Sequence, residues 1–232
     1  INILEKEDEK IWFNNNFVIK FFKDKNIIRK RVLRYKTLKN FIPKLLNYNS
    51  NMYCYLKEDG KVFSEVSSKK TFLKLLREIN RLHKYKKNPK FSKKYIKVKC
   101  YNFYKKKTLK RLNLFYRRFN IHDNSLPING SKKIKLSFLL NKIDWNLLCN
   151  GTFSRYHGDL HFENIIYTKN KKFKFLDWRH EFENNIHWGD IYYDLAKLLH
   201  GIIVSHESIV KQNYQISWNS KQINFKIKNK KI

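Results

Sequence analysis

Residues 157–166 carry the most informative pattern in this chain and read His157-Gly158-Asp159-Leu160-His161-Phe162-Glu163-Asn164-Ile165-Ile166. Two shorter stretches follow, Phe175-Leu176-Asp177-Trp178 and Gly189-Asp190-Ile191-Tyr192-Tyr193-Asp194-Leu195-Ala196-Lys197. The region from 157 to 194 holds seven of the 19 acidic residues of a chain whose formal net charge is +32. These are Asp159, Glu163, Asp177, Glu181, Glu183, Asp190 and Asp194. Such a concentration indicates a cation site; the alternative is that these acids cap helices and offset lysines.

The spacing between the first two stretches is typical of a β-hairpin. Residues 165–168 and 172–176 are extended runs, and Lys169-Asn170-Lys171 supplies the turn between them. Pairing of the two strands would bring Asn164 and Asp177 to the same end of the hairpin. This geometry makes a shared site plausible without reference to any family.

Together the three stretches resemble the aminoglycoside phosphotransferase and choline kinase family, which has a protein-kinase-like fold. The first matches the H-G-D-x-x-x-x-N catalytic loop at every defining position. The second matches the I-D-[WF] metal motif with Leu176 in place of isoleucine, and the third matches G-D-x-x-x-D-L-A. The resemblance is firm over 157–196 and loose over 17–65. It implies an ATP- and Mg²⁺-dependent kinase that moves the γ-phosphate to a hydroxyl of a small molecule.

The resemblance also assigns roles to single residues. Phosphoryl transfer needs positioning and neutralisation of charge, with little covalent work for the protein. Asp159 is then the catalytic base, and Asn164 and Asp177 hold magnesium, a hard cation that prefers oxygen ligands. Lys20 lies inside the apolar run Phe17-Val18-Ile19-Lys20-Phe21 ahead of a helix. It is the candidate for contacting the α- and β-phosphates, with Lys23 as the alternative.

Four neighbours of these residues receive more modest interpretations. We expect His157 to hold the catalytic loop by hydrogen bonding, with proton handling as the alternative. His161 stands beside the base and either contacts substrate or phosphate or is structural. Asp190 fits a helix N-cap, and the matching acid of relatives braces the catalytic loop. Asp194 lies one turn later, where we also expect structural support.

Two features usual in the family are missing from this sequence. Between Asp24 and Ser50 there is no acid, so the helix after Lys20 lacks the glutamate that relatives pair with that lysine. No glycine-rich phosphate loop precedes Phe17; the sequence begins at Ile1 rather than methionine, and we expect its start to be truncated. These gaps keep open an alternative function, a catalytically weak or inactive nucleotide-binding pseudokinase of the same fold.

Hydrophobic periodicity outside the motifs predicts an α+β chain. A β-hairpin is expected over 11–22, with short extended runs at 44–48 and 52–56. Helical spacing marks segments 26–39, 71–82, 112–119, 136–147 (with Gly151 as a terminator) and 190–200. The basic tail 213–232 is expected to be frayed.

We therefore expect a bilobal protein-kinase-like fold. Residues 1–58 would form a small, truncated antiparallel β lobe that binds nucleotide. Residues 59–232 would form a larger, mainly helical C-terminal lobe that carries the catalytic loop and the metal site.

Composition excludes some classes of protein and leaves others open. A hydrophobic fraction of 42% and an aromatic fraction of 16% exclude a disordered chain. The charge of +32 raises a third hypothesis, a basic nucleic-acid-binding module. The lysines run through nearly every segment, which is typical of a solvated surface, so we expect no specific nucleic-acid partner. The scattered cysteines, Cys54, Cys100 and Cys149, suit a reducing cytoplasm, and no apolar run approaches a membrane span.

The sequence leaves the phosphate acceptor open, as it does the oligomeric state. Trp178, Trp188, Tyr192 and Tyr193 lie near the metal motif and would suit an aromatic box for choline or ethanolamine; the alternative is core packing. The run Gly60-Lys61-Val62-Phe63-Ser64-Glu65 also resembles kinase domains of bacterial surface-polysaccharide pathways. That resemblance makes a sugar or sugar precursor an equal candidate.

Overall fold

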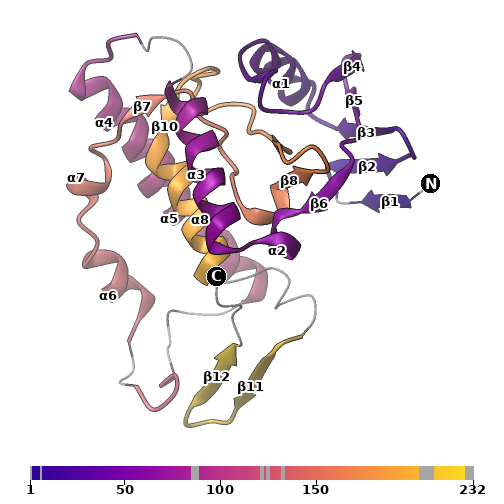
Figure 1. Ribbon diagram of the computed structural model, residues 1–232. Helices are drawn as coiled ribbons and strands as arrows, with labels where there is room; N and C mark the ends of the chain where they lie inside the picture. Colours follow the sequence, from indigo (N-terminus) through magenta and orange to yellow (C-terminus); the bar gives the residue numbers. More distant parts are fainter. Residues whose placement is uncertain are drawn as a thin grey trace. The chain divides into compact units, whose positions relative to one another are not determined.

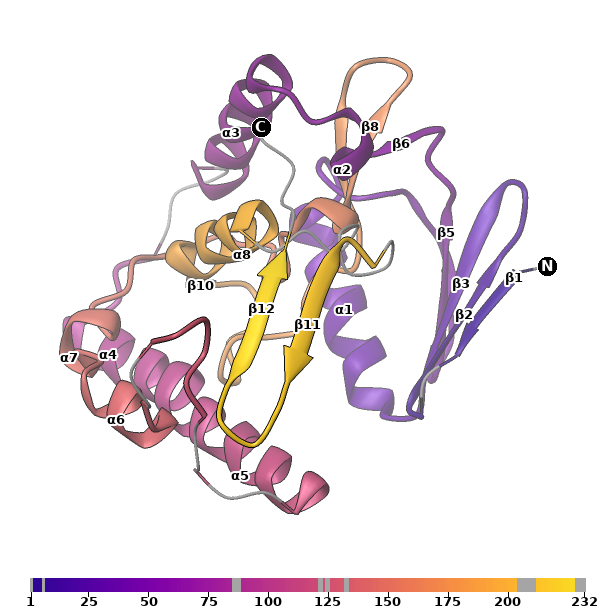
Figure 2. The same cartoon turned by 90° about the horizontal axis from the view of Figure 1, so that it is seen from below.

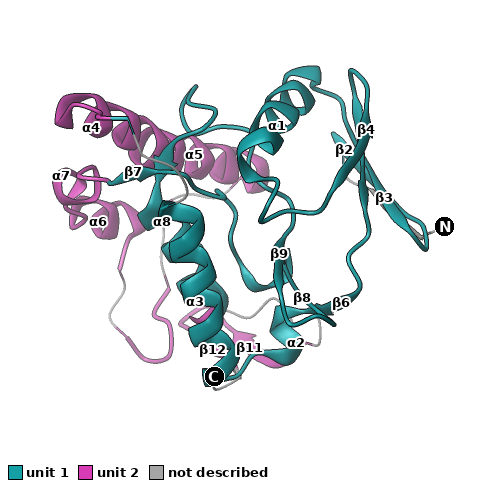
Figure 3. Cartoon of the chain, turned by 45° about the horizontal axis from the view of Figure 1, so that its top comes forward, with its two compact units in different colours: residues 1–89, 152–201, 232 teal, residues 90–151, 202–231 magenta. Residues whose placement is uncertain are grey.

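The computed structural model describes residues 2–5, 7–84, 89–120, 123, 126–131, 134–203 and 212–227. The chain divides into two compact units, one comprising residues 1–89, 152–201 and 232 and the other residues 90–151 and 202–231 (Figure 3). All the candidate site residues lie in the first unit. The lobe boundary between residues 58 and 59 stays a prediction. No described helix is long and apolar enough to cross a membrane.

A five-stranded antiparallel sheet forms the N-terminal part of the first unit (Figure 1). Its strands, in spatial order, are β1 (Asn2–Glu5), β2 (Glu9–Phe13), β3 (Phe17–Phe22), β5 (Met52–Leu56) and β4 (Leu45–Tyr48). The predicted first hairpin is confirmed as β2–β3, with Asn14 N donating to Phe17 O over 3.0 Å at the turn. Val18, Lys20 and Phe22 alternate onto the buried face of β3, because successive side chains of a strand point to opposite faces.

Helix α1 (Lys25–Leu38) follows β3, and Asp24 caps its start by accepting from Asn26 N at 2.8 Å. The buried positions of the helix are Ile28, Arg31, Arg34 and Leu38. They recur at three and four residues, which is the spacing of one helix face. The face turned to the interior therefore carries two arginines between apolar residues.

A three-stranded antiparallel sheet carries the candidate site. Its order is β6 (Gly60–Val62), β8 (Ile165–Thr168) and β9 (Phe173–Phe175), so the predicted hairpin over 165–176 is confirmed. Gly60 has to be glycine, because a Cβ there would lie 2.5 Å from the carbonyl oxygen of Tyr167. The rest of the unit comprises α2 (Phe63–Val66), α3 (Lys69–Lys84), β7 (Phe153–Ser154), a 3₁₀ turn (Phe162–Asn164), β10 (Gly189–Asp190) and α8 (Ile191–Ile203) up to Gly201.

The second unit is mainly helical and ends in a hairpin. It comprises α4 (Lys93–Tyr101), a π-helical turn (Asn102–Lys106), α5 (Lys107–Phe119), α6 (Leu136–Asn141), α7 (Trp145–Leu148), β11 (Tyr214–Trp218) and β12 (Ile223–Ile227). The single helix predicted over 136–147 is two, because Asp144 caps a new start by accepting from Leu147 N at 2.9 Å. The α+β class predicted from the sequence is confirmed.

The tail corrects one expectation. Residues 214–227 were expected to be frayed, but they pair as the β11–β12 hairpin (Figure 2). Asn219 stabilises its turn by accepting from the backbone amides of Lys221 and Gln222, both at 2.9 Å. Residues 228–232, also included in that expectation, lie outside the described residues.

Candidate active site

The loop over residues 157–159 requires the glycine at its centre. Gly158 has φ +92°, a backbone conformation that side chains strongly disfavour. A Cβ at this position would also lie 2.5 Å from the Cβ of Arg179. The loop therefore passes close to the segment after Asp177, which explains why a glycine lies between His157 and Asp159.

Asp194, in the first turn of α8, holds this loop by its backbone. Its carboxylate accepts hydrogen bonds from the amides of His157 and Gly158, both at 2.7 Å, and lies 3.1 Å from His83 Nε2. Asp194 is fully buried; burial raises its pKa, but the hydrogen bonds and positive neighbours outweigh this and keep it below the ordinary value. Asp194 thus binds the backbone of the loop before Asp159, and its supporting role stays a prediction. His83, on α3, is a partner that the sequence did not reveal.

Asp190 supports a different part of the backbone. Its Oδ1 accepts from Thr152 N at 2.9 Å and from Tyr192 N at 3.3 Å. The residue thus ties the chain before β7 to the first turn of α8, which agrees with its predicted position at the start of a helix.

Asp159 is surrounded by hydrogen-bond donors and positive charge. Lys197 Nζ lies 2.8 Å from Oδ1, and His161 Nε2 lies 3.7 Å from Oδ2. The amide nitrogen of Asn164 donates to the Asp159 carbonyl at 2.9 Å and lies 3.4 Å from Oδ2. Burial raises the pKa of Asp159, but His161 and Lys197 outweigh it and hold the pKa well below its usual range. Asp159 is therefore a carboxylate at neutral pH, and a weak proton acceptor.

His161 is held between two carboxylates. Its Nδ1 lies 3.0 Å from Glu163 Oε2, and its Nε2 faces Asp159. The contacts with Asp159 and Glu163 raise the pKa of His161 to about 9, against the effect of partial burial. At neutral pH this side chain is a cation beside the candidate base. Lys197 and His161 together give the carboxylate a positive environment that can receive a phosphate.

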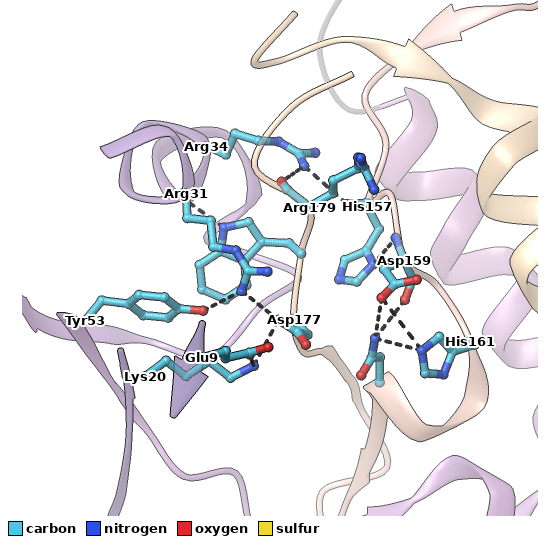
Figure 4. A network of polar contacts seen from close by, with 12 residues as sticks. Glu9, Lys20, Arg31, Arg34, Tyr53, His157, Asp159, His161, Asp177 and Arg179 are labelled. Atoms are coloured by element: carbon cyan, nitrogen blue, oxygen red, sulfur yellow. Dashed lines mark hydrogen bonds and ion pairs between the residues drawn. The ribbon is translucent and has the colours of Figure 1, made fainter. Parts of the chain in front are cut away.

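Asn164 and Asp177 are brought together by the β8–β9 hairpin. Leu176 N donates to Asn164 O at 2.7 Å, so the ladder extends one pair beyond β8 and β9. Asp177 follows directly and lies between the α1 arginines and the Asp159 loop (Figure 4). Its φ of +57° is left-handed, which an aspartate tolerates better than most residues. The expected placement of the two residues at one end of the hairpin is confirmed, while their roles stay predictions.

Asp177 is paired with two basic side chains. Its Oδ1 lies 2.9 Å from Lys20 Nζ and accepts from Arg31 Nη1 at 2.6 Å (Figure 4). Burial raises the pKa of Asp177, but Arg31 and Lys20 outweigh it and lower the pKa far below its usual range. Lys20 also lies 3.7 Å from Glu9 on β2. The carboxylates near Lys20 thus come from β2 and from Asp177, since α1 carries none.

The alternative lysine lies elsewhere. Lys23 and its partner Asp8 are 3.9 Å apart, and both side chains are more than two-thirds exposed, at 78% and 71%. Lys20 is 4% exposed and contacts the metal-motif aspartate. This difference favours Lys20 as the phosphate-contacting lysine.

The buried side chain of Arg34 connects α1 to the loop around His157. Its guanidinium donates to the carbonyls of Tyr156, His157 and Arg179, and its Cζ lies 4.1 Å from the centre of the Tyr156 ring. Arg31 and Arg34 were not predicted from the sequence as part of the site. The signal was present, because both fall at helical spacing on the face marked by Ile28 and Leu38.

His157 is buried and stays neutral. The amide of Asp159 donates to its Nδ1 at 3.3 Å, so the proton resides on Nε2. Burial lowers its pKa to about 4, although Asp194 acts in the opposite direction. His157 thus accepts a hydrogen bond within the loop, and its neutrality argues against proton exchange at neutral pH; its role stays a prediction.

This burial predicts a loss of stability in acid. Because the folded pKa of about 4 is below the ordinary 6.5, the unfolded chain binds the extra proton first. The contribution of His157 to the free energy of unfolding is fully present above pH 6.5. It decreases between about pH 6.5 and pH 4, by up to about 3 kcal/mol in total. Urea unfolding of wild type and His157→Asn across this range should show a shallower pH slope in the variant. An imidazole ¹⁵N spectrum showing a charged His157 at pH 6 would contradict the assignment.

Of the four aromatic residues considered for substrate binding, Tyr192 is 56% exposed, and the other three have different surroundings. Trp178 is 1% exposed, and its Nε1 donates to Arg31 O at 3.1 Å, which favours core packing. The half-buried ring of Trp188 is covered by the guanidinium of Arg155, 4.2 Å from its centre. Tyr193 is half-buried, with Lys197 Nζ 5.9 Å from its ring centre. The positively charged side chains of Arg155 and Lys197 therefore lie near two of the rings, and a substrate role for these aromatic residues stays a prediction.

The atoms offered by Asn164 and Asp177 suit a magnesium ion. Mg²⁺ commonly takes one or two protein oxygens together with nucleotide phosphates. Among the described residues no three His, Cys, Asp or Glu side chains converge on one metal position. Within the described part of the chain, the ion pairs of the Asp177 carboxylate involve Oδ1, so Oδ2 and the amide oxygen of Asn164 are the atoms that could coordinate the ion. These two oxygens fit the ion in their chemistry.

The chain was also compared with known proteins. Solved structures similar to the chain include choline kinase LicA from Streptococcus pneumoniae (TM-score 0.49, 16% identity, covering 89% of this chain and 72% of that chain). Aminoglycoside phosphotransferase APH(2″)-Ib, ADP-bound, is similar at TM-score 0.49 and 16% identity, covering 88% and 70%. Plasmodium vivax ethanolamine kinase is similar at TM-score 0.49 and 18% identity, covering 89% and 62%. No curated protein matches the sequence significantly.

A family model gives the clearest result. The model of the phosphotransferase enzyme family, APH, matches residues 60–217, which is more than half of the 232 residues. The match includes the loop around Asp159, the Asp177 motif and the Asp190–Asp194 segment. It does not include the N-terminal sheet, which carries Lys20. This chain belongs to the phosphotransferase enzyme family.

Proposed function

We propose that this protein is an ATP- and Mg²⁺-dependent kinase that transfers the γ-phosphate to a hydroxyl group of a small molecule. The observation that carries the proposal is the arrangement of Asp159, Asn164 and Asp177. Asn164 contacts Asp159 through its side chain and the Asp177 segment through its backbone. Membership of the phosphotransferase family supports the same reaction class.

Asp159 orients the acceptor in this proposal. The acceptor hydroxyl donates a hydrogen bond to the carboxylate, its oxygen attacks the γ-phosphorus, and the bond to the bridging oxygen of ADP breaks. Because the pKa of Asp159 is low, the carboxylate takes the hydroxyl proton only late, when the new P–O bond has acidified it. The proton then passes to solvent or to the phosphate product. Positioning contributes more than basicity here.

The other polar and charged side chains of the site would bind the nucleotide and its metal ion. Lys20 is the candidate contact for the α- and β-phosphates, and Asn164 and Asp177 would hold the metal. Mg²⁺ held by these two residues would supply positive charge to offset the negative charge that develops during transfer. Lys197 and His161 add two positive groups beside Asp159, where the γ-phosphate would arrive.

The decisive experiment is a screen of acceptors with γ-labelled ATP and the purified protein. Choline, ethanolamine, aminoglycosides, sugars and sugar precursors are the acceptors to include. The expected result is label transfer to one class of acceptor, lost in the Asp159→Asn variant. ATP binding by calorimetry without transfer to any hydroxyl acceptor would favour the second candidate instead.

That second candidate is a nucleotide-binding pseudokinase of the same fold. The observation in its favour is the pairing of Asp177 with Lys20 and Arg31, which gives the metal-motif carboxylate two competing partners.

For an active enzyme, amino alcohols and sugars remain equal candidates for the phosphate acceptor, and the acceptor screen separates them.

Lys197 offers a test that concerns this site alone. Removing its charge in Lys197→Met should lower kcat by roughly tenfold, since a charged partner 2.8 Å from Asp159 is lost. The pKa of Asp159 should rise toward its ordinary value, so activity should begin to fall at a higher pH on the acid side. Lys197→Arg should keep most of the activity. Lys169→Met, which removes an exposed pair with Asp59, is the matched control, and an equal effect there would contradict the prediction.

A further inference from the structure

Arg31 is a buried cation in a position that its surroundings fix. The residue is 8% exposed, and its Nη1 donates to Asp177 Oδ1 at 2.6 Å and to Tyr53 Oη at 2.8 Å. Its Cζ lies 4.6 Å from the centre of the Phe22 ring, and its own carbonyl accepts from Trp178 Nε1 at 3.1 Å. Four contacts from β3, β5 and the Asp177 segment thus hold both ends of the residue.

The charges around Asp177 do not need a metal to balance them. Lys20 and Arg31 place two positive charges within 2.9 Å of one carboxylate oxygen. Glu9 lies farther off, 3.7 Å from Lys20, and α1 has no acid in its first turn or elsewhere. Phosphate oxygens that approach Asp177 would therefore meet a carboxylate whose charge is already offset by donors of the chain itself.

We propose that Arg31 is a built-in counter-cation of Asp177, which lets this chain bind the phosphates of ATP without a divalent metal. The inference rests on the proposed nucleotide site and adds a property of that site. Phosphoryl transfer itself would still use the metal at Asn164 and Asp177.

A competition between Arg31 and the metal follows from the geometry. A divalent cation that binds Asp177 shares the carboxylate with Arg31 and Lys20, and two like charges near one small ion weaken its binding. A charge-assisted hydrogen bond is also lost if the metal displaces Arg31. Arg31 should thus have two effects. ATP binding should depend less on the metal, and the metal itself should bind more weakly.

Calorimetric titration of the wild-type chain with ATP tests the first consequence. The Kd for ATP measured in EDTA should be within about tenfold of the Kd measured in excess Mg²⁺, a difference of at most one charged hydrogen bond. A wild-type protein that binds ATP tightly with Mg²⁺ and by a larger factor more weakly in EDTA would overturn the inference.

Two variants and a matched control locate the effect at Arg31. In Arg31→Met, ATP binding in EDTA should weaken roughly 10- to 100-fold while binding in Mg²⁺ changes much less, because Asp177 then keeps only Lys20 as a counter-cation and repels phosphate more strongly. Arg31→Lys should retain metal-free binding, because it keeps the positive charge; if the methionine variant fails to fold in a thermal unfolding test, loss of metal-free binding in Arg31→Lys would overturn the inference, and the Mn²⁺ comparison below would be made with this variant. Arg29→Met, on the exposed side of α1, should behave as wild type. Equal metal-free affinity in wild type, Arg31→Met and Arg31→Lys would overturn the inference.

Mn²⁺ provides a readout that is independent of nucleotide. Electron paramagnetic resonance of the nucleotide-free proteins should show Mn²⁺ binding about tenfold or more tightly to Arg31→Met than to wild type and Arg29→Met. Unchanged Mn²⁺ affinity would count against the competition. Absence of ATP binding under every condition would overturn the proposed function instead, and the Mn²⁺ comparison would still decide for or against Arg31 as the counter-cation.

Discussion

Asparagine in place of Asp159 is expected to lower kcat by roughly 100- to 10,000-fold, the range for loss of a positioned acid–base group. The amide keeps the size of the side chain but can no longer accept the hydroxyl proton, and it gives up the ionic contact of 2.8 Å with Lys197. ATP affinity should change little, because Lys20, Asn164 and Asp177 remain. Steady-state transfer with labelled ATP and saturating acceptor measures kcat, and calorimetric titration measures the ATP affinity.

Asp59→Asn is the matched control for this substitution. Asp59 is also paired with a lysine, Lys169, at 2.6 Å, but its side chain is 73% exposed. Its kcat should equal that of the wild type. Full activity in Asp159→Asn would remove the role assigned to Asp159, and loss of ATP affinity in the same variant would show that the loop had been displaced.

Alanine in place of Asp194 is expected to reduce the free energy of unfolding by about 3–5 kcal/mol, the usual result of removing one partner from a buried charged network. The substitution leaves the amides of His157 and Gly158 without the acceptor they have at 2.7 Å. It also leaves His83, and the nearby buried charge of Arg34, without their anion. Urea unfolding gives the change in stability, and kcat should fall with it because the loop that carries Asp159 loses its anchor.

Two comparisons separate the network from the general loss of a carboxylate. Asp24→Ala removes the exposed N-cap of α1 and should reduce the free energy of unfolding by only about 1 kcal/mol. Asp194→Asn keeps one acceptor oxygen and should fall between the two. Equal losses in Asp194→Ala and Asp24→Ala would contradict the account of Asp194 as the anchor of the loop.

Local patterns explain why so much of the fold could be predicted. The β2–β3 and β8–β9 hairpins, α1, α3 and α8 all follow from alternation or helical spacing within a few residues. The errors arose where side chains act on the backbone at short range: Asp144 starts a new helix inside a continuous apolar pattern, and Asn219 closes a turn in a tail that is mostly polar. Periodicity does not register such contacts.

In the candidate site, too, local sequence spacing predicted some residues, and only the tertiary structure revealed the others. By itself the sequence determined which residues are predicted to act in catalysis and metal binding, since Asp159, Asn164 and Asp177 occupy short spacings set by one loop and one hairpin. Only the tertiary structure decided which distant residues surround them: Arg31 and Lys20 at Asp177, Lys197 at Asp159, and His83 at Asp194. The physical reason is that a charge selects its partner by distance in space. In a chain with 51 lysines and arginines, the sequence cannot distinguish the few buried against a carboxylate from the many in solvent.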